Sequence, residues 1–195
     1  MVPEPEEPAS YEAVDLGLPS GLKWANMNVR ASKPEEYGDY FAWGELSSKD
    51  SYIDSNYKFG GEVMSKYNST DGLMQLLSVD DIAHISLGDS WHIPTKDDVS
   101  ELIENTTSEW IADYNSTGVS GRLFTGVNGN SIFIPASGCI SGEEHLGNAG
   151  YCQAWSSSLS TSNEARALCL YFDAEQVFRA SDFRNQGFVI RPVKY

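Results

Sequence analysis

The chain has 195 residues, a formal net charge of −15 and a pI near 4.4, with 41% hydrophobic and 21% charged residues. This balance predicts one folded unit, and the strong negative charge excludes nucleic acids and anionic membrane surfaces as main partners. No apolar run approaches the roughly 20 residues that cross a bilayer, so no membrane span is predicted.

The charge is unevenly distributed along the chain. Residues 147–195 hold five basic and four acidic residues, a balance of +1, whereas the other 146 residues hold 8 basic and 24 acidic ones. The acidity therefore belongs to the first three quarters of the chain. An anionic or protein ligand is compatible with the last quarter.

The N-terminus reads as a tether. Residues 2–8 are Val-Pro-Glu-Pro-Glu-Glu-Pro, an acidic, proline-rich run that favours an extended, solvated backbone. We expect residues 1–10 to form an acidic tether and residues 11–195 to form one domain. A removed export signal ahead of Met1 would suit this arrangement.

The first half of the chain predicts two strands followed by two helices. Leu22–Asn28 and Tyr40–Trp43 have strand composition. A helix is predicted over Gly72–Ile85, or a shorter one starting near Val79. The clearest helix runs from an N-cap at Thr95 to Asn105, with an apolar stripe on one side.

The second half predicts short strands. Asn128 and Gly129 form a strong hairpin signal, because this dipeptide adopts positive φ angles readily. The predicted strands are Arg122–Thr125, Ser131–Pro135, Ala167–Phe172 and Phe188–Pro192. Together with the helices they predict an α+β class, rich in loops.

The three cysteines, Cys139, Cys152 and Cys169, lack the spacing of a zinc site. Their simplest interpretation is as small buried apolar residues. A disulfide between Cys152 and Cys169 is also compatible with the sequence.

Four motifs occur in order along the chain. They are Asp15–Val29, Tyr37–Glu45, Trp91–Thr95, and Trp155–Ser158 paired with Gly187–Val193. In this order they resemble the Fibrobacter-type major paralogous domain of exported proteins of Bacteroidetes, over residues 11–194. That family is similar to the formylglycine-generating-enzyme type of C-type lectin-like fold, with few helices packed on small twisted antiparallel sheets.

The resemblance implies a binding or display role on an exported, lipid-anchored cell-surface protein. The founding enzymes of the fold use two nearby cysteines, a pattern that Cys139, Cys152 and Cys169 do not match. Ser156–Ser158 is predicted to be a turn with locally bonded hydroxyls. Adjacent carboxylates, at Asp80/Asp81, Asp97/Asp98 and Glu143/Glu144, are expected to be solvated surface acids. No enzyme activity is predicted.

No cofactor is predicted either. The sugar-binding tripeptides of calcium-dependent lectins do not occur in the sequence. Loops rich in Asp and Asn are compatible with a structural calcium ion, but no ligand set stands out.

The C-terminal quarter supplies the candidate site. Large apolar residues at Trp155, Leu170, Phe172, Val177 and Phe188 are expected in the core. Residues 178–186 are predicted to be a surface loop carrying aromatic and arginine side chains, the types that dominate binding surfaces. The alternative is that Phe178 and Phe183 tuck inward. Strand alternation predicts that Ala167, Cys169 and Tyr171 point outward. The candidate ligand-binding residues are Tyr151, Gln153, Ala154, Ala167, Cys169, Tyr171, Phe178, Arg179, Ala180, Asp182, Phe183, Arg184 and Gln186.

The expected partner is a protein or another macromolecule bound at this C-terminal face. Some proteins of the fold are diversified there by retroelements that rewrite adenines near the end of the gene. The resemblance raises this as a hypothesis for the present chain. The alternative function is a structural or adhesin subunit of a surface or fimbrial assembly.

Overall fold

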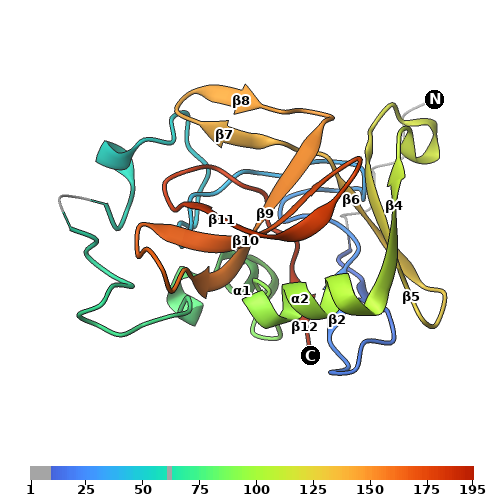
Figure 1. Cartoon of the computed structure of the whole chain (residues 1–195), viewed down its shortest axis with the longest axis horizontal. Coiled ribbons are helices and arrows are strands. Elements are labelled where there is room, and N and C mark those ends of the chain that lie inside the picture. The colour runs from blue at the N-terminus through green and yellow to red at the C-terminus, as the bar shows by residue number, and fades with distance from the viewer. Residues whose placement is uncertain (1–9, 61–62) are drawn as a thin grey trace, which may run out of the picture.

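The computed structural model describes residues 10–60 and 63–195, and the arrangement is α+β, as predicted (Figure 1). Most of the predicted tether, residues 1–9, lies outside the described residues. Within these two described ranges, short strands form four small antiparallel sheets, and two α-helices and three 3-10 turns lie between them. No helix among the described residues is long and apolar enough to cross a membrane.

One sheet joins both ends of the chain. Its strands follow the order β1–β2–β12–β3, so the C-terminus pairs with the first quarter of the chain. The bounds are Ala13–Asp15 for β1, Lys23–Ala25 for β2, Trp91–His92 for β3 and Val193–Lys194 for β12.

The other sheets are local in sequence. The β4–β5–β6 sheet comprises Thr106–Ile111, Gly121–Gly126 and Ser131–Pro135. The β7–β8 hairpin comprises Cys139–Ser141 and Glu144–Leu146. The third sheet has the order β11–β10–β9, with β9 at Tyr151–Leu159, β10 at Arg166–Asp173 and β11 at Val177–Phe183.

Helix α2, Lys96–Asn105, confirms the clearest prediction. The Thr95 hydroxyl accepts a hydrogen bond from the Asp98 amide, and the Asp98 carboxylate accepts one from the Thr95 amide. This reciprocal capping box satisfies two amides that the first turn would leave unpaired. Asp98 is therefore buried, which corrects its expected place on the surface.

Helix α1 is shorter and later than predicted, at Ile82–Leu87. Its N-cap is Asp81, whose Oδ1 accepts hydrogen bonds from the amides of Ala83 and His84. Oδ2 of the same carboxylate accepts from the Ile93 amide, which ties the helix start to the end of β3. The preceding residues form the 3-10 turn η2, Ser78–Asp80, because this cap fixes where the α-helix begins. The other 3-10 turns are η1, Asp54–Asn56, and η3, Tyr114–Ser116.

The predicted hairpin is confirmed. Strands β5 and β6 pair Leu123 with Phe133 and Phe124 with Ile132 around the turn. Gly129 in the turn has φ of 85°, a conformation that a residue with a Cβ rarely adopts.

Two predicted strands are instead loop segments that contact each other. Phe41 and Phe188 form an isolated antiparallel bridge, with N–H···O distances of 2.9 and 3.1 Å in the two directions. The rings of Phe188 and Trp155 stack at 4.0 Å, and the Trp155 indole donates to the Phe41 carbonyl. These two segments therefore lie along the β9 strand as covering loops.

The serine run at Ser156–Ser158 is not a turn, because it lies within β9 and is buried. The Ser156 hydroxyl donates to the Leu168 carbonyl on the neighbouring strand, and the Ser157 hydroxyl donates to the Pro94 carbonyl. Small side chains with local acceptors allow a buried strand to pass close to its neighbours.

Candidate functional site

The three C-terminal strands hold most of the predicted site. In Figure 1 they lie in the middle of the view, between the β7–β8 hairpin above and α2 below. Tyr171 on β10 is directly opposite Gln153 on β9 and Phe178 on β11. The segment 178–183 is thus a paired strand, which corrects its prediction as a loop.

An aromatic ladder crosses these strands on one side, which we call the outer face. The Tyr151 and Tyr171 rings stack at 5.7 Å, and the Tyr171 and Phe178 rings lie 4.8 Å apart. Phe178 is 41% exposed and the two tyrosines are half-buried. Because Phe178 points out from the edge strand, the alternative that it tucks inward is wrong.

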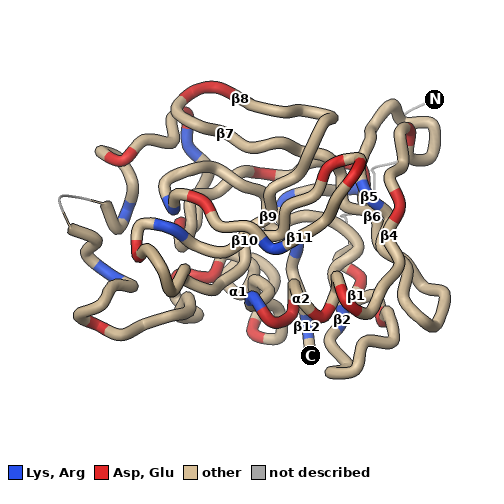
Figure 2. Tube along the Cα trace, viewed as in Figure 1, with Lys and Arg blue, Asp and Glu red and all other residues tan. Residues whose placement is uncertain are grey.

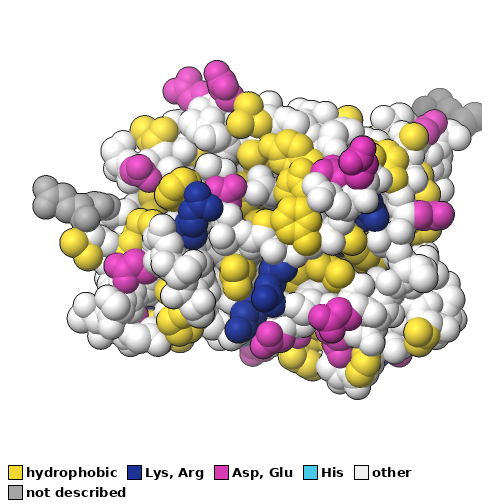
Figure 3. Space-filling view, viewed as in Figure 1, with side chains coloured by type: hydrophobic (Ala, Val, Ile, Leu, Met, Phe, Trp, Pro, Cys, Tyr) yellow, Lys and Arg dark blue, Asp and Glu magenta, His cyan; other side chains and the backbone are white. Residues whose placement is uncertain are grey.

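Figure 3 shows hydrophobic side chains gathered over this part of the molecule, bordered by both acidic side chains and Lys or Arg side chains. Ala180 and Asp182 continue the same face of β11, opposite Cys169 and Ala167 of β10. An exposed aromatic cluster with a charged border is typical of binding surfaces.

Next to the ladder, a hydrogen bond between two side chains covers the central strand β10. The Gln153 amide on β9 donates to the Asp182 carboxylate on β11 at 3.1 Å, across the intervening β10 strand. Cys169 and Ala167 lie on that strand and are fully buried, which corrects their prediction as exposed. Burial raises the pKa of the Cys169 thiol, and the Asp182 carboxylate adds to the increase. Cys169 therefore supports the face from below and does not contact solvent.

The cysteines are free and buried, as the simplest interpretation predicted, and no disulfide joins Cys152 to Cys169. Burial raises the pKa of Cys152 to about 11. The Cys139 sulfur lies 3.1 Å from the Tyr151 hydroxyl and so holds one end of the ladder against the β7–β8 hairpin. The thiols therefore act as packing groups at neutral pH.

Three further predicted residues lie off this face. Arg179 is exposed but projects from the other side of β11, where it donates to the Ser100 hydroxyl of α2 at 2.8 Å. Phe183 is 43% exposed on that side, under the Arg166 guanidinium at 4.3 Å. Ala154 is buried on the inner side of the sheet, opposite Leu170.

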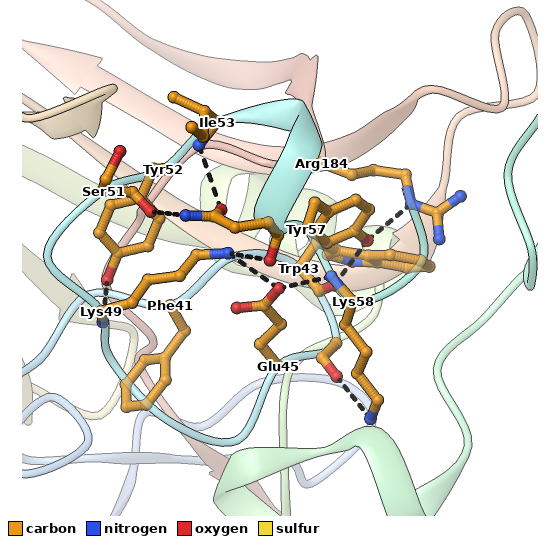
Figure 4. A network of polar contacts seen from close by, with 12 residues as sticks. Phe41, Trp43, Glu45, Lys49, Ser51, Tyr52, Ile53, Tyr57, Lys58 and Arg184 are labelled. Atoms are coloured by element: carbon orange, nitrogen blue, oxygen red, sulfur yellow. Dashed lines mark hydrogen bonds and ion pairs between the residues drawn. The ribbon is translucent and has the colours of Figure 1, made fainter. Parts of the chain in front are cut away.

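Arg184 is the largest departure from prediction, because it is fully buried. Its guanidinium donates to the Tyr57 hydroxyl and to three backbone carbonyls, those of Lys66, Tyr67 and Glu164. It also lies 4.7 Å from the Trp43 ring centre (Figure 4). Arg184 is thus a structural anchor that ends β11, and it cannot contact a ligand. Gln186 follows in a half-buried turn, its amide bonded to the Phe183 carbonyl.

A second buried network lies beside this anchor. Asp80 accepts from the Lys58 ammonium at 2.6 Å, from Lys66 at 2.5 Å and from the Tyr67 hydroxyl at 2.6 Å. Although burial alone raises the pKa of this carboxyl, these donors hold it below its ordinary value. Asp80 is therefore not the solvated surface acid that was expected.

Its neighbour Asp81 is also buried, and burial raises its pKa despite three backbone donors. The two adjacent carboxylates thus have opposite shifts, because Asp80 faces two cations and Asp81 faces only amides among its hydrogen-bond donors. Both hold neighbouring segments in place, Asp81 as the N-cap of α1 and Asp80 as the acceptor of three side-chain donors.

Burial also changes the charge that a partner meets at the last quarter of the chain. Arg184 and Arg191 are 0% and 1% exposed. The Arg191 guanidinium donates to Asn28 and to two backbone carbonyls, and burial lowers its pKa to about 9. Without these two, the basic residues of 147–195 number three against four acidic ones, so the approachable balance is −1. Figure 2 shows acidic positions spread over the described part of the trace.

Sequence reasoning missed the acidic residues beside the ladder and one groove. Asp173 and Glu175 lie at the β10–β11 turn, and the Tyr171 hydroxyl donates to Asp173 at 3.1 Å. Two adjoining cavities of about 580 and 320 Å³ share Met74, Leu159 and Thr161. The groove lies at the far end of β9, away from the ladder at its start.

Within residues 10–60 and 63–195, no group of three or more histidine, cysteine, aspartate or glutamate side chains is placed to hold a metal ion. The structure thus adds no support for a calcium site. Comparisons with family models, with curated proteins and with solved structures each found no match.

Proposed function

We propose that this chain is a non-enzymatic ligand-binding domain of the C-type lectin-like fold, of the formylglycine-generating-enzyme type. The domain is exported and displayed at a cell surface through a lipid anchor, and its ligand is a protein. The four ordered sequence motifs support the family and the location. The α+β arrangement of small antiparallel sheets is compatible with that fold.

The exposed aromatic ladder of Tyr151, Tyr171 and Phe178 is the observation that carries the proposal. Large aromatic residues exposed on an edge strand lower the solubility of a protein, and such exposed apolar patches commonly mark binding sites. Phe178 is 41% exposed on such an edge strand, and its ring lies tilted against Tyr171 with the ring centres 4.8 Å apart. Rigid aromatic side chains bind partners at low entropic cost.

The rest of the domain favours a fixed scaffold beneath this face. Arg184 and Arg191 each join segments distant in sequence by several hydrogen bonds. The inner side of the β9–β11 sheet contributes Leu170 and Phe172 to the core. On the outer side, Ala167 and Cys169 also belong to the core, so the positions free to vary are the more exposed ones such as Phe178.

The test is a selection of random peptides displayed on phage against the immobilised full chain. Selected peptides are then measured against a face variant, Tyr171→Ala with Phe178→Ala, with circular dichroism to show that it folds. If the double variant unfolds, Phe178→Ala alone replaces it. The proposal predicts at least a tenfold loss of affinity.

A matched control replaces two apolar residues of comparable exposure elsewhere, Val79→Ala with Ile85→Ala, which are 63% and 53% exposed. Two outcomes contradict the assignment of the site. In one, the peptides bind the face variant as tightly as the wild type. In the other, they lose as much affinity for the control variant as for the face variant.

A further inference from the structure

We propose that the aromatic ladder receives a cationic group, a lysine or arginine side chain carried by a protein segment. This inference rests on the proposed binding function of the outer face. It reverses the expectation from sequence that a ligand would meet Arg179 and Arg184.

The ladder presents ring faces of the kind that attract cations. The Tyr151, Tyr171 and Phe178 rings form a continuous row, with neighbouring centres 5.7 and 4.8 Å apart. The negative face of an aromatic ring attracts an ammonium or guanidinium group. The same chain uses this interaction internally, since the Arg184 guanidinium lies 4.7 Å from the Trp43 ring and the Arg166 guanidinium lies 4.3 Å from the Phe183 ring.

The ladder runs across the strands from Tyr151 to Phe178, and carboxylates flank it in both directions along the strands. Asp173 and Glu175 are in the turn that follows Tyr171, and Asp182 lies on the same face of β11, four residues beyond Phe178. Although desolvation opposes it, hydrogen bonds from the Glu175 and Gln176 amides lower the pKa of Asp173. That carboxylate is therefore ionised at neutral pH, and a cation on the ladder lies between negative groups.

The buried Arg122 guanidinium donates to the Asp173 backbone carbonyl at 2.9 and 3.2 Å and offsets part of the negative charge there, whereas the two other nearby arginines point away from the face. Strand alternation puts Arg179 and Arg166 on the other side of the β10–β11 pair from Tyr171. Arg179 is bonded to α2, and Arg166 is bonded to the Ser181 carbonyl and stacked on Phe183. Beyond the face, the net charge of −15 draws a cationic partner toward the domain and speeds its association.

The experiment uses the same phage selection, and the measured quantity is the amino-acid composition of the selected peptides. The inference predicts that selected peptides are enriched at least threefold in lysine and arginine over the unselected library. Peptides made synthetically should bind more weakly as sodium chloride rises from 50 to 500 mM, because salt screens exposed charges over about one Debye length, roughly 10 Å at 0.1 M.

Isosteric variants locate the charge effect. Glu175→Gln with Asp182→Asn should weaken the synthetic basic peptides at least fivefold. Glu104→Gln with Glu109→Gln removes the same charge from exposed positions on α2 and β4, and should change affinity less than twofold.

The outcomes separate the two proposals. Peptides that need Tyr171 and Phe178 but lack basic residues, or ignore the Glu175 and Asp182 changes, overturn the cationic class and leave the binding face standing. Peptides that bind equally well without the ladder, or an absence of any selected peptide, overturn both.

Discussion

Arg179 and Arg184 lie close together in sequence, yet they belong to opposite environments. Arg179 is exposed at the end of a polar contact with α2, whereas Arg184 is fully buried among tyrosines and carbonyls. Between them, the edge strand β11 ends at Phe183, and the chain then turns into the core. The position at which the chain turns inward therefore determines whether a charged residue is buried in the scaffold or lies at the surface.

The same contrast holds for the two aromatic groups. Tyr57, Tyr67 and Trp43 surround Arg184 and carry hydrogen bonds or ring contacts on every side. The Tyr171 and Phe178 rings lie tilted against each other, and Phe178 leaves ring surface open to solvent. The first group stabilises the fold and the second remains available to a partner. Substitutions should therefore separate stability from binding.

Arg184→Ala should have the largest effect. It strips the hydrogen-bond donors from the Tyr57 hydroxyl and from the carbonyls of Lys66, Tyr67 and Glu164, and it leaves a cavity. Buried acceptors without donors cost about 1–3 kcal/mol each, so we expect a loss of at least about 3 kcal/mol, or failure to fold. Urea unfolding measures it. Arg179→Ala is the control and should cost no more than about 0.5 kcal/mol. Equal losses would erase the contrast between the two sites.

Asp80→Asn should come next and should depend on pH. The folded-state pKa of Asp80 is below its ordinary value, so the carboxylate stabilises the fold above about pH 4. That stability disappears as pH falls through the lowered pKa. At pH 7 the variant should lose about 2 kcal/mol, since hydrogen bonds to charged groups contribute about 1.5–3 kcal/mol.

The measurement is the difference in unfolding free energy between wild type and the variant from pH 7 to pH 2. The difference should shrink toward low pH. Asp50→Asn, at an exposed carboxylate, is the control and should give a small, flat difference. If the difference in unfolding free energy between wild type and Asp80→Asn instead grew as the pH fell, the direction assigned to the Asp80 pKa shift would be wrong.

Gln153→Ala should have an intermediate effect, about 1 kcal/mol, because one hydrogen bond to a carboxylate is lost. It also removes the side chain that covers Cys169. We expect N-ethylmaleimide to label Cys169 at least tenfold faster in this variant than in wild type, by mass spectrometry of digests. Cys152 serves as the internal control, and faster labelling of both thiols would indicate general unfolding and not local opening.

Elements with strong local signals were predictable from the sequence. The capping box at Thr95 and Asp98 and the turn at Asn128 and Gly129 depend on neighbours only a few residues away. All the interactions that determine these two features lie within a few residues, so both were placed correctly. The buried apolar residues Trp155 and Phe172 were also predictable, since few environments other than the core suit them.

The site was predictable only in part, because burial of its polar residues depends on distant segments. Arg184 is buried by carbonyls of Lys66 and Tyr67, more than a hundred positions earlier. Cys169 is covered by a bridge between two other strands. No local pattern encodes such partners. Strand alternation predicted the outward direction of Tyr171 on β10, and Phe178 is exposed as predicted, although it lies on the edge strand β11 and not in a loop.

Phe178→Ala should have the smallest effect on stability and so sharpens the contrast most. The ring is 41% exposed and contacts Tyr171, so its removal should change the unfolding free energy by no more than about 0.5 kcal/mol. Phe172→Ala, six positions earlier and fully buried, should cost about 3–5 kcal/mol. Urea titrations of the two variants provide the comparison. A loss above 2 kcal/mol for Phe178→Ala would make this ring part of the core and would remove the free surface on which the binding proposal depends.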